Sequence, residues 1–164
     1  MILDLKKVFQ GDGESCSFNY RLDMSTDDID GYHPFVSPVT VKGTVKGQNG
    51  FALLNAKASF DFSMPCNRCM VQTNKKYNYD FSHTLVLSLE NEDDDKYIKV
   101  TDYKLDLDGL IRADILLELP SKFLCSGNCK GLCPICGKNL NNGTCSCETH
   151  QIDPRLEALK KLID

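Results

Sequence analysis

Residues 52–69 read Ala-Leu-Leu-Asn-Ala-Lys-Ala-Ser-Phe-Asp-Phe-Ser-Met-Pro-Cys-Asn-Arg-Cys and indicate how the chain folds. Every even position from 52 to 64 is apolar, and every odd position from 55 to 63 is polar. A period of two is typical of a β-strand with one buried face. We therefore expect a long strand that ends directly before Cys66 and Cys69.

Similar alternation on both sides of this segment predicts further strands. An Asn49-Gly50 turn joins an expected strand over 39–46 to the strand that begins at Phe51. Alternation over 16–22 predicts an earlier strand. The apolar set after the cysteine pair predicts a later one, which places that pair at a hairpin tip: Val71, Tyr77, Tyr79, Phe81, Leu85, Leu87 and Leu89. The expected fold class is mainly β (α+β), an antiparallel meander or a barrel-like sheet.

Two helices are expected in addition to the strands. Asp108 has the position of an N-cap for a helix over 109–119, which Pro120 ends. Asp153-Pro154 predicts a second helix start, followed by an apolar stripe. The acidic run 90–95 between strands and helix is expected to be a solvated loop. We divide the chain into a β body over 1–120 and a cysteine-rich module over 121–164.

Length and composition exclude several classes of protein. The 164 residues carry a formal net charge of −4, and the pI is near 5.4, which argues against a generic nucleic-acid binder. There is no apolar run long enough to span a bilayer, and charged residues interrupt the first nine positions, so we expect a cytoplasmic protein. No phosphate loop, zinc-protease motif or nucleophile elbow is present, so an enzyme is not expected.

Nine cysteines are the main chemical signal of the sequence. Reducing cytosol does not maintain structural disulfides, so these thiols need another role. Cys16 stands alone in an apolar strand register and is expected to fill the core. The other eight form four close pairs, the number that two closed four-thiolate Zn²⁺ sites require: Cys66, Cys69, Cys125, Cys129, Cys133, Cys136, Cys145 and Cys147.

The pairing into sites follows from spacing. Cys133-Pro-Ile-Cys136-Gly has the form of a zinc knuckle, and Cys145 and Cys147 follow closely, so these four are expected to share one ion. Cys66, Cys69, Cys125 and Cys129 then form the other site. Two alternatives stay open: Cys125 and Cys129 could join Cys133 and Cys136, and His150 could replace one cysteine.

A redox dithiol and two of the histidines have weaker support in the sequence. A redox dithiol at Cys66 and Cys69 is disfavoured, because that chemistry places the pair at a strand-to-helix turn. His83 shares the register of apolar neighbours and is expected at the core or an edge, and His33 is expected in a loop.

Several motifs recur in an order that resembles a known family. They are Cys66-Asn-Arg-Cys69, the segment from Asp106-Leu-Asp-Gly to Leu119-Pro120, Cys129-Lys-Gly-Leu-Cys-Pro-Ile-Cys-Gly-Lys-Asn-Leu140, Cys145-Ser-Cys147, and Asp153-Pro-Arg-Leu-Glu-Ala-Leu159. The chain resembles the YceD family, the bacterial large ribosomal RNA subunit accumulation proteins. The resemblance implies a cytoplasmic role in processing or accumulation of large-subunit ribosomal RNA, without an implied catalytic residue.

Charge is distributed unevenly along the chain. Residues 1–120 hold 13 basic and 19 acidic groups, and residues 121–164 hold 6 and 4. The C-terminal module and the hairpin tip are therefore expected to contact the partner, either a ribosomal RNA precursor or a large-subunit ribosomal protein. Alternatives are a protein-binding adaptor that never contacts RNA and a thiol-based redox or zinc-responsive protein. The candidate partner-binding residues are Arg68, Lys122, Lys130, Lys138 and Arg155.

Overall fold

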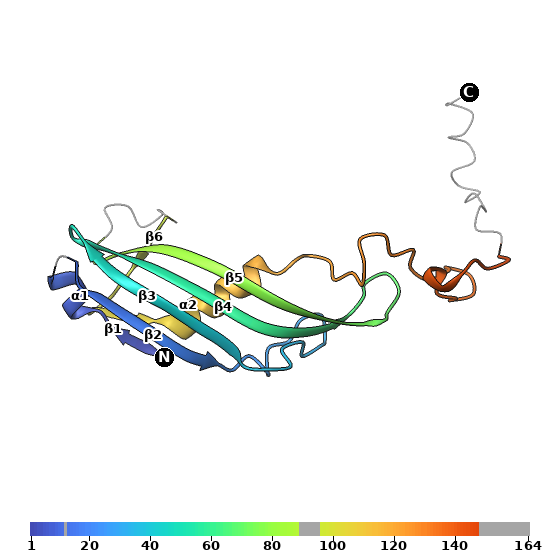
Figure 1. Ribbon diagram of the computed structural model, residues 1–164, viewed down its shortest axis with the longest axis horizontal. Coiled ribbons are helices and arrows are strands. Elements are labelled where there is room, and N and C mark those ends of the chain that lie inside the picture. Colours follow the sequence, from blue (N-terminus) through green and yellow to red (C-terminus); the bar gives the residue numbers. More distant parts are fainter. Residues whose placement is uncertain (12, 89–95, 148–164) are drawn as a thin grey trace, which may run out of the picture. The chain divides into compact units, whose positions relative to one another are not determined.

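The computed structural model describes residues 1–11, 13–88 and 96–147, and in these ranges it is mostly β (Figure 1). A five-stranded sheet has the order β2-β3-β4-β5-β6, and β1 pairs with β7 in a separate two-stranded sheet. The elements are β1 (Ile2–Asp4), α1 (Lys6–Gln10), β2 (Ser15–Leu22), β3 (Val39–Gln48), β4 (Phe51–Pro65), β5 (Gln72–Val86), β6 (Tyr97–Lys99), β7 (Lys104–Asp106), α2 (Leu107–Glu118) and the 3₁₀-helix η1 (Leu140–Asn142).

The alternation of β4 is confirmed residue by residue. All seven even positions from 52 to 64 are buried, and none is more than 2% exposed. β3 and β4 are antiparallel from Gln48↔Phe51 onward. Asn49 and Gly50 form their turn with φ of 45° and 86°, the left-handed conformations that a tight hairpin turn needs.

An aromatic cluster holds β4 against its neighbour β5. The ring of Phe60 lies 5.7 Å from that of Tyr77 and 5.8 Å from that of Tyr79, between centroids. Phe35 comes from the connection between β2 and β3, and its ring centroid lies 5.3 Å from that of Phe60. Edge-to-face and tilted ring pairs of this kind add to the stabilisation that burial itself gives.

The expected meander is right for β2 to β5, and the sheet adds a further strand, β6, that the sequence analysis did not predict. β6 pairs with β5 in parallel, with Leu85↔Ile98 in register, so the sheet is mixed. A parallel partner requires the chain to return to the same end of the sheet before it pairs. The sheet also stays open, with β2 and β6 at its edges, so it does not close into the barrel that the sequence left possible.

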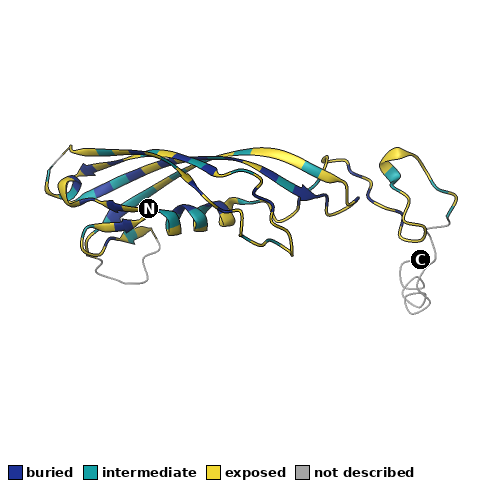
Figure 2. Cartoon of the chain, turned by 90° about the horizontal axis from the view of Figure 1, so that it is seen from below, coloured by how far each residue is buried: buried dark blue, intermediate teal, exposed yellow. Residues whose placement is uncertain are grey.

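Helix α2 lies along one face of the large sheet (Figure 2), and it buries Leu107, Ile111 and Ile115. Its N-cap is Asp106, not Asp108 as the sequence suggested. The carboxylate of Asp106, which is the last residue of β7, accepts the Gly109 N–H at 3.4 Å. Asp108 therefore lies in the first turn, where a carboxylate is favoured by the helix dipole.

The burial of Cys16 differs from what the sequence suggested, whereas that of His83 agrees with it. Cys16 is half-buried on β2 and does not fill the core. His83 lies at the margin of the core, where its Nε2 is 2.8 Å from the Asp114 carboxylate of α2.

The chain divides into two compact units. The first comprises Met1–Met64 and Asn74–Ser121, and the second comprises Pro65–Thr73 and the segment from Lys122 onward. The loop between β4 and β5 thus belongs with the cysteine-rich segment. Within the described ranges, no helix combines the length and apolar character needed to span a membrane. The expected acidic loop 90–95, His150 and the helix expected from Asp153 fall outside the described residues.

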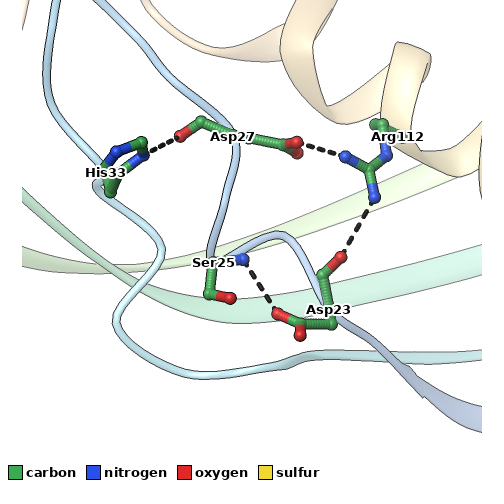
Figure 3. A network of polar contacts seen from close by, with 5 residues as sticks. All are labelled: Asp23, Ser25, Asp27, His33 and Arg112. Carbon is green, nitrogen blue, oxygen red and sulfur yellow. Dashed lines mark hydrogen bonds and ion pairs between the residues drawn. The ribbon is translucent and has the colours of Figure 1, made fainter.

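Arg112 of α2 anchors the loop that connects β2 to β3 (Figure 3). Its guanidinium pairs with the Asp27 carboxylate and donates to the Asp23 carbonyl at 3.1 Å. The Asp23 carboxylate in turn accepts the Ser25 N–H at 2.9 Å, which lowers the pKa of Asp23. The His33 ring lies 3.3 Å from the Asp27 carbonyl oxygen and closes the network.

We expect Arg112→Met to lower the free energy of unfolding by about 2 kcal/mol, because it removes charged hydrogen bonds and leaves the mostly buried Asp27 unpaired. Urea unfolding with the near-ultraviolet signal of the body measures this change. Arg21→Met on the exposed side of β2 is the matched control and should change the free energy by less than about 0.5 kcal/mol. Equal effects of the two variants would contradict the anchoring role.

Candidate metal centres

The first cysteine cluster joins two segments that are far apart in the sequence. Cys66 and Cys69 come from the β4–β5 loop, and Cys125 and Cys129 come from the segment after α2. The four Sγ atoms all lie within 4.8 Å of one another. The Cys66–Cys129 pair is 3.8 Å apart between sulfurs, and the Cys69–Cys125 pair is 3.6 Å apart.

Backbone hydrogen bonds shape the loop that carries the first pair. The Cys66 N–H donates to the Val71 carbonyl at 2.9 Å, and the Met70 N–H donates to the Cys66 carbonyl at 2.9 Å. Met70 adopts a φ of 58°, so the chain turns back tightly after Cys69. A two-residue spacing in such a turn directs both sulfurs at one point.

Polar contacts from this loop hold the second segment in place. The Asn67 N–H donates to the Phe123 carbonyl at 2.8 Å, and the Asn67 side chain accepts the Phe123 N–H. The Arg68 guanidinium donates to the Cys129 carbonyl at 2.9 Å. The two residues between the cysteines of the Cys-Asn-Arg-Cys motif therefore position the other half of the same cluster.

The second cluster is local in sequence. Cys133, Cys136, Cys145 and Cys147 also have all four sulfurs within 4.8 Å of one another. The Gly137 N–H donates to the Cys133 carbonyl at 2.9 Å, and Gly137 takes a φ of 71°, the left-handed conformation that a knuckle turn uses. The structure thus groups all eight cysteines as the sequence analysis paired them, and not as the alternative with Cys125 and Cys129 beside Cys133.

Asn141 links the two clusters and was missed by the sequence analysis. It lies in η1, between the two cysteine pairs of the second cluster, yet its side-chain amide donates to the Cys129 sulfur of the first at 3.3 Å. Its carbonyl oxygen accepts the Lys130 N–H at 2.8 Å. No signal in an Asn-rich turn distinguishes this residue from an ordinary turn former.

The surroundings of the first cluster stabilise negative charge on sulfur. Burial acts to raise the pKa of Cys66, but backbone N–H groups from both segments of the cluster donate to its sulfur and bring that pKa down to about 6. The Asn141 amide lowers the pKa of Cys129. Hydrogen bonds with the Cys129 and Cys69 sulfurs raise the pKa of Cys125 to about 12.

The second cluster divides its charge in the same way. Backbone N–H groups of Cys136 and Ile135 lower the pKa of Cys133 to about 6. Contact with the Cys136 sulfur raises the pKa of Cys147 to about 12. Four crowded sulfurs can therefore all be thiolates only when a cation compensates their charge.

The geometry fits a tetrahedral metal ion. Metal–sulfur bonds of about 2.3 Å place two sulfurs about 3.8 Å apart along a tetrahedron edge, close to the separations in the first cluster. A disulfide would need about 2.05 Å. All nine cysteines are free thiols. Each of the two clusters could hold one metal ion, and all four sulfurs would be used as ligands.

The candidate partner-binding cations have varied surroundings. Arg68 is engaged with Cys129, and Lys138 donates to the Thr144 carbonyl at 2.8 Å. Lys122 and Lys130 are exposed, and Arg155 lies outside the described residues. Residues 65–73 and 122–147 contain these four described cations and no carboxylate side chain. Two ions bound by four thiolates each would carry −2 apiece, so the metal-loaded segment would be close to neutral.

Comparisons with known proteins point to one family. The family model described as large ribosomal RNA subunit accumulation protein YceD matches residues 54–163. The chain is 33% identical over 141 residues to "Uncharacterized protein YlbN" of Bacillus subtilis (strain 168), with 78% of this chain and 76% of that protein covered.

A second relative is from maize. It is "Large ribosomal RNA subunit accumulation protein YCED homolog 1, chloroplastic" of Zea mays, 38% identical over 61 residues, which cover 37% of this chain and 21% of that protein. No solved structure matches the chain.

We expect double variants to reveal which cysteines share an ion. Cys66→Ser with Cys129→Ser should remove one metal equivalent, because both ligands belong to the first cluster. Cys66→Ser with Cys136→Ser should remove two, because each cluster then loses a ligand. Metal content per chain, measured after anaerobic purification, checks both. Equal losses in the two double variants would contradict the grouping.

We expect Asn141→Ala to weaken metal binding at the first cluster by roughly 10- to 100-fold, since an outer hydrogen bond to a ligand sulfur is lost. Competition for Zn²⁺ against a chromophoric chelator measures the affinity. Asn142→Ala is the control, because Asn142 contributes only a backbone N–H bond to Asn139. An unchanged affinity in Asn141→Ala would show that its contact with sulfur is incidental.

Proposed function

The chain belongs to the YceD family of large ribosomal RNA subunit accumulation proteins, and from this membership we propose that it supports the accumulation of large-subunit ribosomal RNA by binding, not by catalysis. Its partner is the ribosomal RNA precursor or a large-subunit ribosomal protein, and its place of action is the cytoplasm. The maize relative carries the same role in its name.

The arrangement of the eight thiols carries the non-catalytic part of the proposal. Each cluster offers four sulfurs to one ion, and such closed sites are structural, whereas a catalytic ion keeps a position for water or substrate. We propose Zn²⁺ for both clusters, because an all-sulfur tetrahedral set is the ligand set that zinc favours. When bound, the ion supplies a crosslink between segments of chain.

The protein's own residues define what such a crosslink would fix. Asn67 and Arg68 hold the segment after Lys122 against the β4–β5 loop, so the first ion would lock that arrangement. The second ion would fix the knuckle after Cys133. A small cysteine-rich segment has too little core to fold on its own, and structural zinc can contribute on the order of 10 kcal/mol of apparent binding energy.

The lowered pKa of Cys66 and of Cys133 is the observation that favours a redox role as the second candidate. Low-pKa thiols react readily when they are exposed. Both sulfurs belong to buried residues inside four-thiol clusters, which limits that access. Alkylation of the native, metal-loaded protein separates the candidates. About one reactive thiol per chain, that of Cys16, is expected for structural sites, and four or more would favour the redox role.

We expect deletion of the gene in its host to lower the ratio of large- to small-subunit ribosomal RNA. The wild-type gene should restore the ratio, and Cys66→Ser with Cys129→Ser should not, because the first metal site is lost. The control is Cys16→Ser, which lies outside both clusters and should restore it. Quantification of the two mature RNAs and their precursors provides the measurement. An unchanged ratio in the deletion strain would overturn the proposed function.

A further inference from the structure

One side of the large sheet is polar over most of its length. The outer sheet face, as we define it, comprises the odd residues 15–21 of β2, the even residues 40–46 of β3, the odd residues 55–63 of β4 and the even residues 74–82 of β5. Every one of these side chains is polar or charged, and none is buried. The apolar residues of the same strands point to the opposite side, which α2 covers (Figure 2).

The charge of this face is opposite in sign to that of the whole chain. It carries five cations, Arg21, Lys42, Lys46, Lys57 and Lys76, against two carboxylates, so its net charge is +3 in a chain of −4. Most of the body's acidic residues that the structure describes lie in loops or in and beside α2. The net charge that argued against nucleic-acid binding therefore does not describe this surface.

The cations of the face are mostly left without acidic partners. Lys57 pairs with Asp80 at 3.0 Å. Within the described residues, no ion pair involves the other four cations. The second carboxylate, that of Asp61, accepts a hydrogen bond from the Ser37 hydroxyl.

Two lysines are placed where they repel each other. Lys42 of β3 and Lys57 of β4 are direct partners in the register, and Asn19 of β2 continues the same row. Neighbouring strands are about 4.8 Å apart, and like charges directly opposite each other destabilise a sheet. A bound polyanion would relieve this repulsion. A hollow of about 760 Å³ lies at this row, and all of its lining residues belong to β2, β3, β4 and β5.

The kind of polyanion follows from what the face lacks. Single strands are held by stacking of bases on aromatic rings. On this side of the sheet, among the described residues, aromatic rings come only at the margins, with Phe51 at the β3–β4 turn and Tyr97 on β6. The rings of β2, β4 and β5 otherwise point to the inner side. Duplex RNA is recognised through phosphates, 2′-hydroxyls and shape, for which lysine, asparagine, serine and threonine side chains suffice.

We propose that the outer sheet face binds the phosphate backbone of double-stranded RNA. The inference rests on the proposed function for the choice of RNA, and it assigns the contact to the β body instead of the cysteine-rich segment. That segment would be close to neutral once both clusters are loaded. The cations of β3 and β2 extend from Lys46 to the row of Arg21, which is roughly 20 Å along the strands and long enough to contact several phosphates.

The test uses the purified, zinc-loaded full chain and an RNA duplex of about 20 base pairs. The wild type should bind with an affinity that falls steeply with salt. Lys42→Gln with Lys57→Gln should bind roughly tenfold or more weakly, and the slope of log affinity against log salt should decrease by about two. Lys6→Gln with Lys7→Gln on α1 removes the same charge from exposed positions elsewhere and should leave the affinity within about twofold of the wild type.

Each other result overturns the inference. Loss of affinity in the α1 control equal to that of the sheet variant would indicate a general charge effect. Equal binding by a single-stranded oligonucleotide of the same length would overturn the choice of duplex RNA. Binding of large-subunit ribosomal proteins but not of the duplex would overturn RNA as the partner. The unfolding temperature of the sheet variant should change little, because the repulsion between Lys42 and Lys57 is lost together with the exposed Lys57–Asp80 ion pair. This measurement excludes misfolding as the cause.

The proposed function and the RNA-binding role of the outer sheet face can be contradicted independently of each other. If the sheet variant binds the duplex as the wild type does, the assignment to the outer sheet face is wrong, while the effect of deletion on ribosomal RNA can still hold. If deletion leaves the ribosomal RNA ratio unchanged, the proposed function is wrong whatever the purified protein binds.

Discussion

The strict alternation of β4 is the constraint on which most of the structure depends. Because a strand has a side-chain period of two, its apolar even positions can be buried only if all of its polar odd positions face solvent. A shift of one residue would bury Lys57 and Asp61 and expose Phe60. The same strand therefore sets the core on one side and the outer sheet face on the other. Its end also delivers Cys66 to the first cluster.

Much of this could be predicted because the signals are local. Alternation, the Asn49-Gly50 turn and the pairing of eight cysteines depend on residues that are near in sequence or limited by stoichiometry. The parallel pairing of β6 could not be predicted, since it depends on where a connection delivers the chain. The N-cap was predicted wrongly as Asp108 instead of Asp106, because both carboxylates precede helical residues and only the exact strand end separates them.

The residues that surround the candidate metal ligands could not be predicted from the sequence, for a different reason. Ligands are recognised by residue type, but the groups that orient ligands are ordinary polar residues whose role depends on three-dimensional position. Asn141 comes from one cluster and contacts a sulfur of the other. Arg68 looked like a partner-binding cation, yet its guanidinium donates to the Cys129 carbonyl. Both therefore contribute to the shape of the first cluster.

The net charge of the whole chain does not describe the charge of the outer sheet face, and binding of a polyanion would depend on local and not total charge. The acidic groups that the structure describes in the body lie mostly away from the outer sheet face, and the cations of the cysteine-rich segment would be matched by the formal charge of two loaded clusters. Loading with metal would therefore change more than stability, because it would remove the positive excess of the segment that holds the clusters. Under the two proposals, the outer sheet face would then carry the larger positive charge and would contact the anion, while the metal sites would support folding.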